Sequence, residues 1–523
     1  MTQKPAGIDD RPEQLRDPVR KSEGGTVSER YLAKLAEKSF LNLWSYPNPY
    51  RDQGINGNGD GKELCDLLAV CGEHIVIFSE KTIDWPSGDI ETAWSRWAKR
   101  AIQASAKQTK GAERWLAGHP ERLFLDRACS APFPIDLPPK EVRRVHRIVV
   151  ANGSAGACHR FTEGRSASLK IIPEIIGDAH WARRESVPFA IGDIDPDGSF
   201  VHVFNEAALD VVMSELDTIR DFTDYLAKKA AFVRSGNLRE AAGEENLFAY
   251  YAIRMNSENE HDFVISAKKV PITIDHQHYP RLTGNPRYAA KKDADRSSYL
   301  WDRLIETFTT RMLDGTSFTP EGQEFDLRKY ESGIRHMALV PRFSRRNYSE
   351  AVAHAMERGL RCERVVCTIP GTRINRDGVK ESETAFFVLT LKYLHRMQAN
   401  GGYEKYRQRR SAYSLIYAKG LLERCAHLKR VIGFALEPPE QGRESSEDLI
   451  YAEQCDWTDE ERAAIKNDCK RADLLQNIVE RRHEGKEFPD VGTIVVESPD
   501  AHQPHLNRKQ RRALKARARK RNR

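Results

Sequence analysis

The stretch GKELCDLLAVCGEHIVIFSEK, residues 61–81, contains two apolar runs separated by a short turn at Gly72. Both runs are apolar and have the length of strands, so the stretch predicts a β-hairpin. Successive side chains of a strand point to opposite faces, which places Ser79 and Lys81 on one face of the second strand. Asp66 lies at the start of the first strand. The hairpin therefore brings an aspartate and a lysine to the same end.

Helical and strand patterns on either side extend this hairpin into a mixed α/β unit. Residues 26–44 show helical spacing of apolar side chains, and Thr26 and Glu29 have the spacing of a capping box. A second, longer helix is predicted within residues 91–116, and a further strand within residues 142–153. The order helix, hairpin, helix, strand is typical of an α/β domain.

The chain has 523 residues, which is too long for one compact core and predicts two or three domains. We expect a disordered tail over residues 1–25 and an α/β domain over residues 26–165. Residues 170–490 are predicted to form a second, larger α/β or α+β domain, for which no motif indicates a function. Residues 501–523 form a basic tail, and no internal repeat is visible.

The positive charge is concentrated at the C-terminal end. The net charge is +7, and the final stretch NRKQRRALKARARKRNR carries ten lysines and arginines without an acid, which leaves 7 − 10 = −3 elsewhere. Such a block attracts nucleic acid; the alternative is a solvated tail that aids solubility. The predicted nucleic-acid-binding residues are Arg508, Lys509, Arg511, Arg512, Lys515, Arg517, Arg519, Lys520 and Arg521.

Composition excludes several classes of protein. The hydrophobic fraction of 40% and the charged fraction of 30% are typical of a soluble globular protein. The first residues form no secretory signal, and no apolar run is long enough to cross a bilayer. Nine scattered cysteines without zinc-binding spacing indicate reduced thiols in a cytoplasmic protein. The oligomeric state is not indicated.

Three short motifs resemble metal-binding sequences but fit simpler structures better. DIDPDG at residues 193–198 has Phe204 where a calcium loop requires a glutamate, so a hairpin turn is the preferred interpretation. NGNGDG at residues 56–61 fails in the same way, because its twelfth residue is Leu67. The histidines of DHQHY at residues 275–279 are interpreted as solvent-facing side chains.

The residues of the first hairpin fit the chemistry of phosphodiester hydrolysis. This reaction uses a divalent cation, held by hard oxygen ligands, and a nearby cation that stabilises negative charge. DLLAV, the turn at Gly72, the apolar strand IVIF and the lysine fifteen residues after Asp66 together resemble the PD-(D/E)xK nuclease superfamily, in its restriction-endonuclease-like branch. The resemblance covers about residues 28–150. It implies a restriction-endonuclease-like domain and a cofactor of Mg²⁺ or Mn²⁺.

The resemblance also implies roles for residues outside the hairpin. Members of the family often place a metal-binding glutamate on the helix before it. Glu37 is the best match in this chain, and Glu63 is a second candidate. Some members carry a glutamine on the helix after the lysine strand, which corresponds to Gln108 or, less well, to Gln103.

This chain departs from the family pattern at Ser79, where a carboxylate is expected. Glu80 can replace the missing acid if strand twist or a bulge turns it inward. Alternatively, Asp66, Glu37 and a backbone oxygen hold the metal, while Ser79 contributes a hydroxyl or a water contact. The third alternative is an inactive site on a fold that only binds nucleic acid or a partner. An ordinary hairpin with a surface lysine also explains the residues.

The expected function is that of a metal-dependent nuclease that acts on nucleic acid, with DNA favoured over RNA as the substrate. Asp66, Glu80 and Glu37 are its metal ligands, and Asp66, Glu80, Lys81 and Gln108 its catalytic residues. The alternative is a non-catalytic nucleic-acid-binding or adaptor protein on a degenerate nuclease fold.

Overall fold

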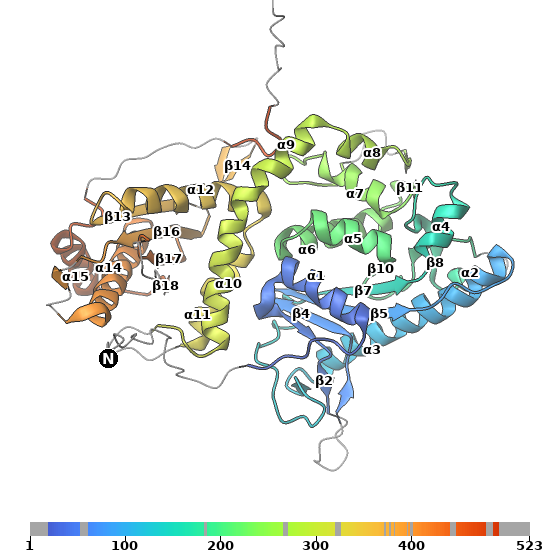
Figure 1. The fold of residues 1–523 in the computed structure, drawn as a ribbon, viewed down its shortest axis with the longest axis horizontal. Helices are drawn as coiled ribbons and strands as arrows, with labels where there is room; N and C mark the ends of the chain where they lie inside the picture. Colours follow the sequence, from blue (N-terminus) through green and yellow to red (C-terminus); the bar gives the residue numbers. More distant parts are fainter. Residues whose placement is uncertain are drawn as a thin grey trace, which may run out of the picture.

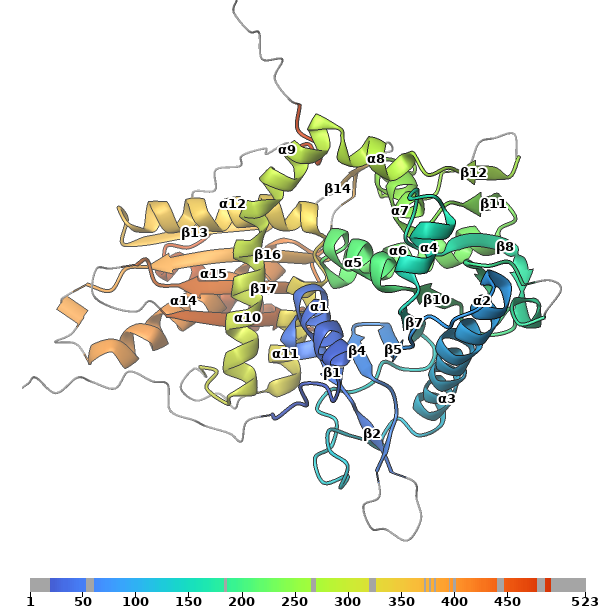
Figure 2. The same ribbon diagram turned by 45° about the vertical axis from the view of Figure 1, so that its right-hand side comes forward.

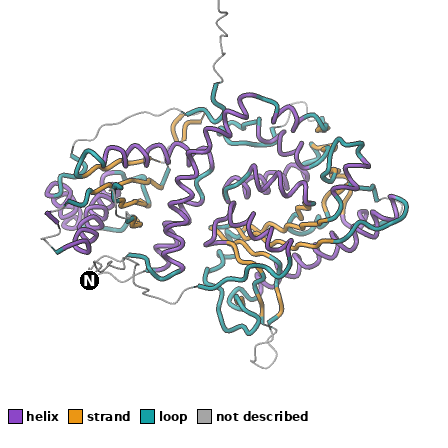
Figure 3. The backbone as a smooth tube through the Cα atoms, in the orientation of Figure 1, coloured by secondary structure: helices purple, strands orange, loops and turns teal. Residues whose placement is uncertain are grey.

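The computed structural model shows a mixed α/β protein with several sheets (Figure 1, Figure 3). Among the residues that the structure describes, no helix combines the length and the apolarity needed to cross a bilayer. The predicted basic tail, with its proposed nucleic-acid-binding residues, lies outside the described residues. These are residues 19–52, 61–182, 186–264, 270–318, 326–370, 373–375, 378–380, 382–394, 396–397, 401–439, 446–476 and 485–490.

The predicted hairpin forms the centre of the largest sheet. The strands of this sheet are, in spatial order, β1 (Ser45–Pro47), β4 (Leu67–Cys71), β5 (His74–Thr82), β7 (Arg144–Asn152) and β10 (Val201–Phe204). β1, β4 and β5 are antiparallel neighbours, whereas β7 runs parallel to β5 and β10 runs parallel to β7. Leu67 pairs with Phe78 across the hairpin, and Gly72 closes it with φ at +62°. Glycine adopts this left-handed conformation without strain.

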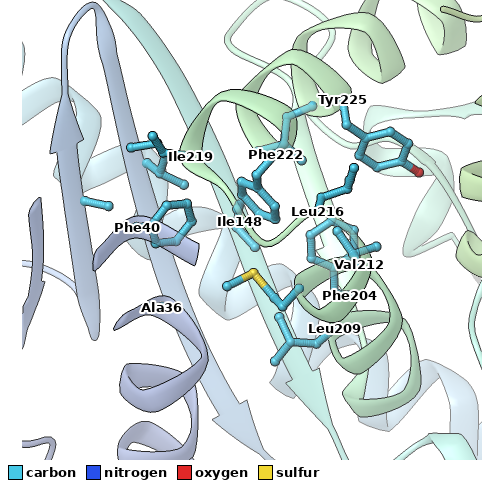
Figure 4. Packing of buried hydrophobic residues seen from close by; sticks show 14 of the residues in the cluster. Ala36, Phe40, Ile148, Phe204, Leu209, Val212, Leu216, Ile219, Phe222 and Tyr225 are labelled. Carbon is cyan, nitrogen blue, oxygen red and sulfur yellow. The ribbon is translucent and has the colours of Figure 1, made fainter. Parts of the chain in front are cut away.

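Helices cover both faces of this sheet. One face is covered by α3 (Ala104–Gly118), the last part of a long helix that begins with α2 (Ile90–Ala98) and a π-helical turn η1 (Lys99–Gln103). The other face is covered by α1 (Val27–Trp44), α5 (Glu206–Glu215) and α6 (Ile219–Arg234). Figure 4 shows Phe40 of α1 close to Phe222 of α6, with ring centroids 5.2 Å apart. Burial on both faces explains why the hairpin strands are continuous apolar runs.

The two strands predicted around the turn of DIDPDG are present, but they do not pair with each other. β9 (Ala190–Asp193) belongs to a second sheet, whose order is β12 (Ile272–Ile274), β11 (Leu238–Ala241), β8 (Lys170–Ile176) and β9. The prediction of a hairpin at DIDPDG is therefore wrong, because β9 and β10 each pair with the free edge of a different sheet. Because β10 pairs with β7, the first sheet crosses the domain boundary expected at residues 165–170.

A third sheet lies in the C-terminal half of the chain (Figure 2). Its order is β13 (Arg364–Pro370), β16 (Thr384–Leu391), β17 (Arg430–Leu436) and β18 (Glu447–Glu453). β16 and β17 are parallel and are connected by α14 (Gly402–Arg424), which packs on one face. The other face packs against α10 (Tyr299–Leu313) and α12 (Arg342–Gly359). This arrangement agrees with the predicted α/β or α+β class.

One apolar core connects the N-terminal and C-terminal halves. It includes Phe40 of α1, Trp301 of α10 and Phe434 of β17, so the first and third sheets share buried side chains through α10. All nine cysteines are free thiols, and four of them are buried. The remaining elements are β2 (Tyr50–Arg51), β3 (Lys62–Glu63), β6 (Leu123–Phe124), α4 (Ala155–Phe161), η2 (Gly177–His180), α7 (Glu244–Ala252), α8 (His278–Thr283), α9 (Pro286–Ala294), η3 (Asp295–Ser298), α11 (Leu327–Ala338), β14 (Arg373–Asn375), β15 (Gly378–Lys380) and α15 (Asp459–Arg471).

Candidate functional site

Asp66 lies directly before β4 and is buried against the end of β5. Its backbone N–H donates to the carbonyl of Phe78 at 3.1 Å, which places Asp66 opposite Ser79 in the antiparallel ladder. Its Oδ2 accepts a hydrogen bond from the backbone N–H of Glu80 at 2.5 Å. Only 8% of Asp66 is exposed. The carboxylate is thus held at the end of the hairpin where Lys81 also lies.

Two further carboxylates gather around Asp66. The Nδ2 of Asn48 donates to Glu29 Oε2 at 3.2 Å and to Glu63 Oε1 at 3.4 Å, while its backbone N–H donates to the carbonyl of Asp66 at 3.0 Å. Burial, followed by the hydrogen bond and charge of Glu63 and the charge of Glu29, raises the pKa of Asp66 to about 8. The backbone hydrogen bond from Glu80 opposes this shift only in part. Neighbouring carboxylates in a buried site raise the pKa of a carboxyl group, and a bound cation would lower it again.

Ser79 and Gln108 meet on the face of the sheet that α3 covers. The Ser79 hydroxyl donates to Gln108 Oε1 at 3.1 Å, and Ser79 is fully buried. Lys81 follows on the same strand face and is half-buried. The structure therefore brings Gln108 to the residue that occupies the position of the expected acid. Gln103 lies in the π-helical turn, more than one helical turn before Gln108.

Glu80 contributes its backbone to Asp66 but directs its carboxylate elsewhere. Oε2 accepts from the hydroxyl of Ser28 at 2.9 Å. Oε1 accepts from the hydroxyl of Thr82 at 2.7 Å and from Nδ2 of Asn152 at 2.6 Å. Ser28 belongs to α1, so this carboxylate lies on the sheet face opposite to α3. Strand alternation produces this orientation, because Glu80 lies between Ser79 and Lys81.

The glutamate of α1 that approaches Asp66 is Glu29 rather than Glu37. Glu37 is exposed, and the groups that sense its charge are Lys21 and Glu306. Glu29 also forms the predicted capping box with Thr26, which is why the sequence indicated a structural role for it. The sequence did contain a signal for the role of Glu29 at the site, because Glu29 is the acid nearest to the start of the helix that precedes the hairpin. The second candidate, Glu63, does lie beside Asp66.

The acidic motif DIDPDG is held by cationic side chains of the protein itself. Arg234 donates to both carboxylate oxygens of Asp193, at 2.6 and 3.1 Å. Asp195 accepts from Arg147 at 2.6 Å and from Lys110 at 3.0 Å. These contacts pair two of the three acids of the motif with cations of the protein. In DHQHY, His278 contacts Asp275 at 3.0 Å. Residues 56–60 of NGNGDG lie outside the described residues.

The comparisons with known proteins give no neighbour from which to transfer a function. No family model matches the chain, and no curated protein or solved structure matches it. The interpretation of the site therefore depends on its geometry and on the residue types that it contains.

The donor set around Asp66 fits a hard divalent cation. Mg²⁺ is commonly held by one or two carboxylates together with waters and substrate phosphate, and Asp66 and Glu63 provide such a pair. Among the described residues, no group of three or more His, Cys, Asp or Glu side chains has the arrangement of a complete metal centre. A metal held by Asp66 and Glu63 would therefore need further ligands from water or substrate.

Proposed function

We propose that this chain is a metal-dependent phosphodiesterase that cleaves nucleic acid at the site around Asp66. The observation that carries the proposal is the convergence of Asp66, Glu63 and Glu29 at the end of β5 that carries Lys81. The order of these residues supports the likeness to PD-(D/E)xK nucleases: an aspartate opens one strand of a hairpin and a lysine ends the other. The glutamine of the following helix faces the same end.

Each residue of the site has a distinct role in this proposal. Asp66 and Glu63 hold Mg²⁺ or Mn²⁺, and Glu29 contributes negative charge beside them. The bound metal polarises the phosphate and lowers the pKa of an attacking water. Lys81 stabilises the negative charge that develops on the phosphate oxygens. Gln108 is a positioning residue, because it acts through the hydroxyl of Ser79.

A cleavage assay tests this function directly. Labelled single-stranded and double-stranded DNA and RNA are incubated with the full chain in Mg²⁺, in Mn²⁺ and in a chelator. We expect metal-dependent cleavage that Asp66→Asn and Lys81→Ala each reduce by about 100-fold or more, while nucleic-acid binding persists. Asp84→Asn and Lys62→Ala are matched controls, since both side chains are exposed near the site. Absence of cleavage on every substrate with either metal contradicts the proposal.

A non-catalytic nucleic-acid-binding protein is the second candidate. The observation in its favour is that Ser79 occupies the position of an acid while the carboxylate of Glu80 is bound by three donors on the opposite face. This candidate predicts salt-sensitive binding that survives Asp66→Asn and Lys81→Ala, without cleavage by the parent chain under any condition.

A further inference from the structure

The long helix formed by α2, η1 and α3 exposes side chains of a single charge. Between Arg96 and Arg114, every exposed position is a lysine or an arginine, and the other positions are buried or half-buried. We call these six residues the basic row. They are Arg96, Lys99, Arg100, Lys107, Lys110 and Arg114.

Among the described residues, the basic row has a single ion pair, and the charge of Arg96 also lowers the pKa of the exposed Asp89. Lys110 pairs with Asp195 at 3.0 Å, yet its side chain remains 54% exposed. The other five form no ion pair with any residue in the described part of the chain. Exposed helices that serve only as solvated surfaces usually mix both signs, as α15 does with Lys466 and Asp468. A row of one sign repels itself and is maintained only at some cost in stability.

The packing of the helix fixes the direction in which the basic row points. Trp97, Ile102 and Leu116 are almost fully buried, so the opposite side of the helix faces solvent. The row spans 18 residue steps, which corresponds to about 27 Å along a helix. Figure 1 shows this helix along the edge of the molecule away from the sheet that contains β13 and β18.

The basic row and Gln108 lie on different sides of the same long helix. Gln108, which contacts Ser79 at 3.1 Å, follows Lys107 directly in α3. The same helix therefore reaches the site strand with its inner side and presents cations with its outer side.

We propose that the basic row binds the phosphate backbone of a nucleic acid along the solvent-facing side of the long helix. A nucleic acid is the partner that fits, because duplex DNA carries a regular charge about every 1.7 Å along its axis. An acidic protein lacks this regularity. The inference deepens the proposed function, and it rests on that function for the choice of partner. It assigns no base recognition, since phosphate contacts are independent of sequence.

The test measures binding to a short labelled duplex and single strand across a range of salt concentrations. The row variant, in the full chain, carries Arg96→Gln, Lys99→Gln, Arg100→Gln, Lys107→Gln and Arg114→Gln. Glutamine has a helix propensity similar to those of lysine and arginine, so circular dichroism should be unchanged. We expect affinity at low salt to fall tenfold or more, and the slope of log K against log salt to fall by up to about 4.

A charge-matched control separates this surface from a general effect of net charge. It replaces five exposed cations on other helices by glutamine: Arg328, Lys329, Arg358, Lys466 and Lys470. Both variants are repeated in a full chain whose tail lysines and arginines are glutamine, because the tail also attracts polyanions. The control should retain the parent slope in both backgrounds.

The outcomes distinguish this inference from the proposed function. If the row variant and the control bind nucleic acid with equal affinity and equal salt dependence, the basic row is not the binding surface. This conclusion holds even if the protein cleaves nucleic acid. Binding to polyglutamate, which represents an acidic protein partner, is measured in the same way. If the row variant loses binding to polyglutamate but keeps binding to nucleic acid, the basic row binds an acidic protein and the proposal is wrong. Binding that depends on the row in a chain that cleaves nothing overturns the nuclease but supports the row.

Discussion

Glu80 is the residue whose role the structure changes most. Its carboxylate accepts hydrogen bonds from Ser28, Thr82 and Asn152, and only 8% of the residue is exposed. It therefore connects α1, β5 and β7. A metal role for Glu80 stays a prediction, whereas a structural role follows from these contacts.

We predict that Glu80→Ala destabilises the fold by about 1–3 kcal/mol, because its three donors lose a buried, charged acceptor. Denaturant unfolding measures the change. Lys81→Ala is the control and should stay within about 0.5 kcal/mol, since Lys81 is only half-buried. If both variants unfold at the parent midpoint, the Glu80 contacts do not contribute to stability.

The histidine pair between β5 and β7 predicts loss of stability in acid. His74 Nδ1 and His146 Nε2 lie 2.9 Å apart, and burial lowers the pKa of His74 to about 4 and that of His146 to about 3. In the unfolded chain both groups titrate near pH 6.5, so the unfolded state binds more protons between these values. Stability is therefore complete above about pH 6.5 and decreases as the pH falls toward 4.

We expect this loss to be on the order of 3 kcal/mol for one buried histidine. It is measured by urea unfolding at neutral pH and near pH 4.5. The variant His146→Leu should show a smaller decrease between the two conditions than the parent chain. An identical decrease in both proteins would mean that other groups cause the acid sensitivity.

At the scale of elements, the loop between β9 and β10 is an electrostatic junction. Arg147 of β7 has a fully buried side chain and pairs with Asp195 at 2.6 Å and with Glu113 of α3 at 3.4 Å. Arg234 of α6 binds Asp193. The loop thereby connects the sheet to the helices on both of its faces.

Arg147→Met should destabilise the protein by about 3 kcal/mol, because it leaves Asp195 and Glu113 without their buried partner. Lys110→Met is a matched control at the same carboxylate. It should cost less than about 1 kcal/mol, since Lys110 is largely exposed. Thermal unfolding in the presence of calcium provides a second test. An increase in Tm with calcium would contradict the pairing of these acids with arginine.

Most elements near the site followed from sequence periodicity, but their partners did not. The hairpin, the helix of residues 27–44 and the long helix that contains Gln108 have clear patterns. The strands β9 and β10 also had clear patterns, yet each pairs with a different sheet. A strand pattern defines which side chains are buried, while the neighbouring strand depends on which sheet edges remain free.

At the scale of the whole molecule, a C-terminal segment is docked far from α15. Glu487 contacts His261 at 2.9 Å and Lys291 at 3.6 Å, and Arg346 donates to the carbonyls of Lys486 and Glu487. Burial alone would raise the pKa of Glu487, but these three cations lower it to about 2. The segment at residues 485–490 directly precedes the stretch that leads to the basic tail.

Glu487→Gln should release this segment, because three cationic groups lose the carboxylate that they surround. We expect trypsin to cleave after Lys486 at least about tenfold faster, which corresponds to a loss of about 1.4 kcal/mol. Mass spectrometry of limited digests measures this rate. Asp490→Asn serves as the control, since its pairs with Arg287 and Lys486 are exposed and should contribute little. Equal cleavage in both variants would contradict the docking.

The sequence by itself determined the hairpin, the two helices that flank it and the positions of Asp66 and Lys81, because strand and helix periodicities are local. It also explained why Glu80 faces away from Lys81. Only the tertiary structure decided that Glu29 lies beside Asp66 and that Gln108 meets Ser79. These contacts join elements distant in the chain, and their geometry depends on how the faces of one shared core pack together.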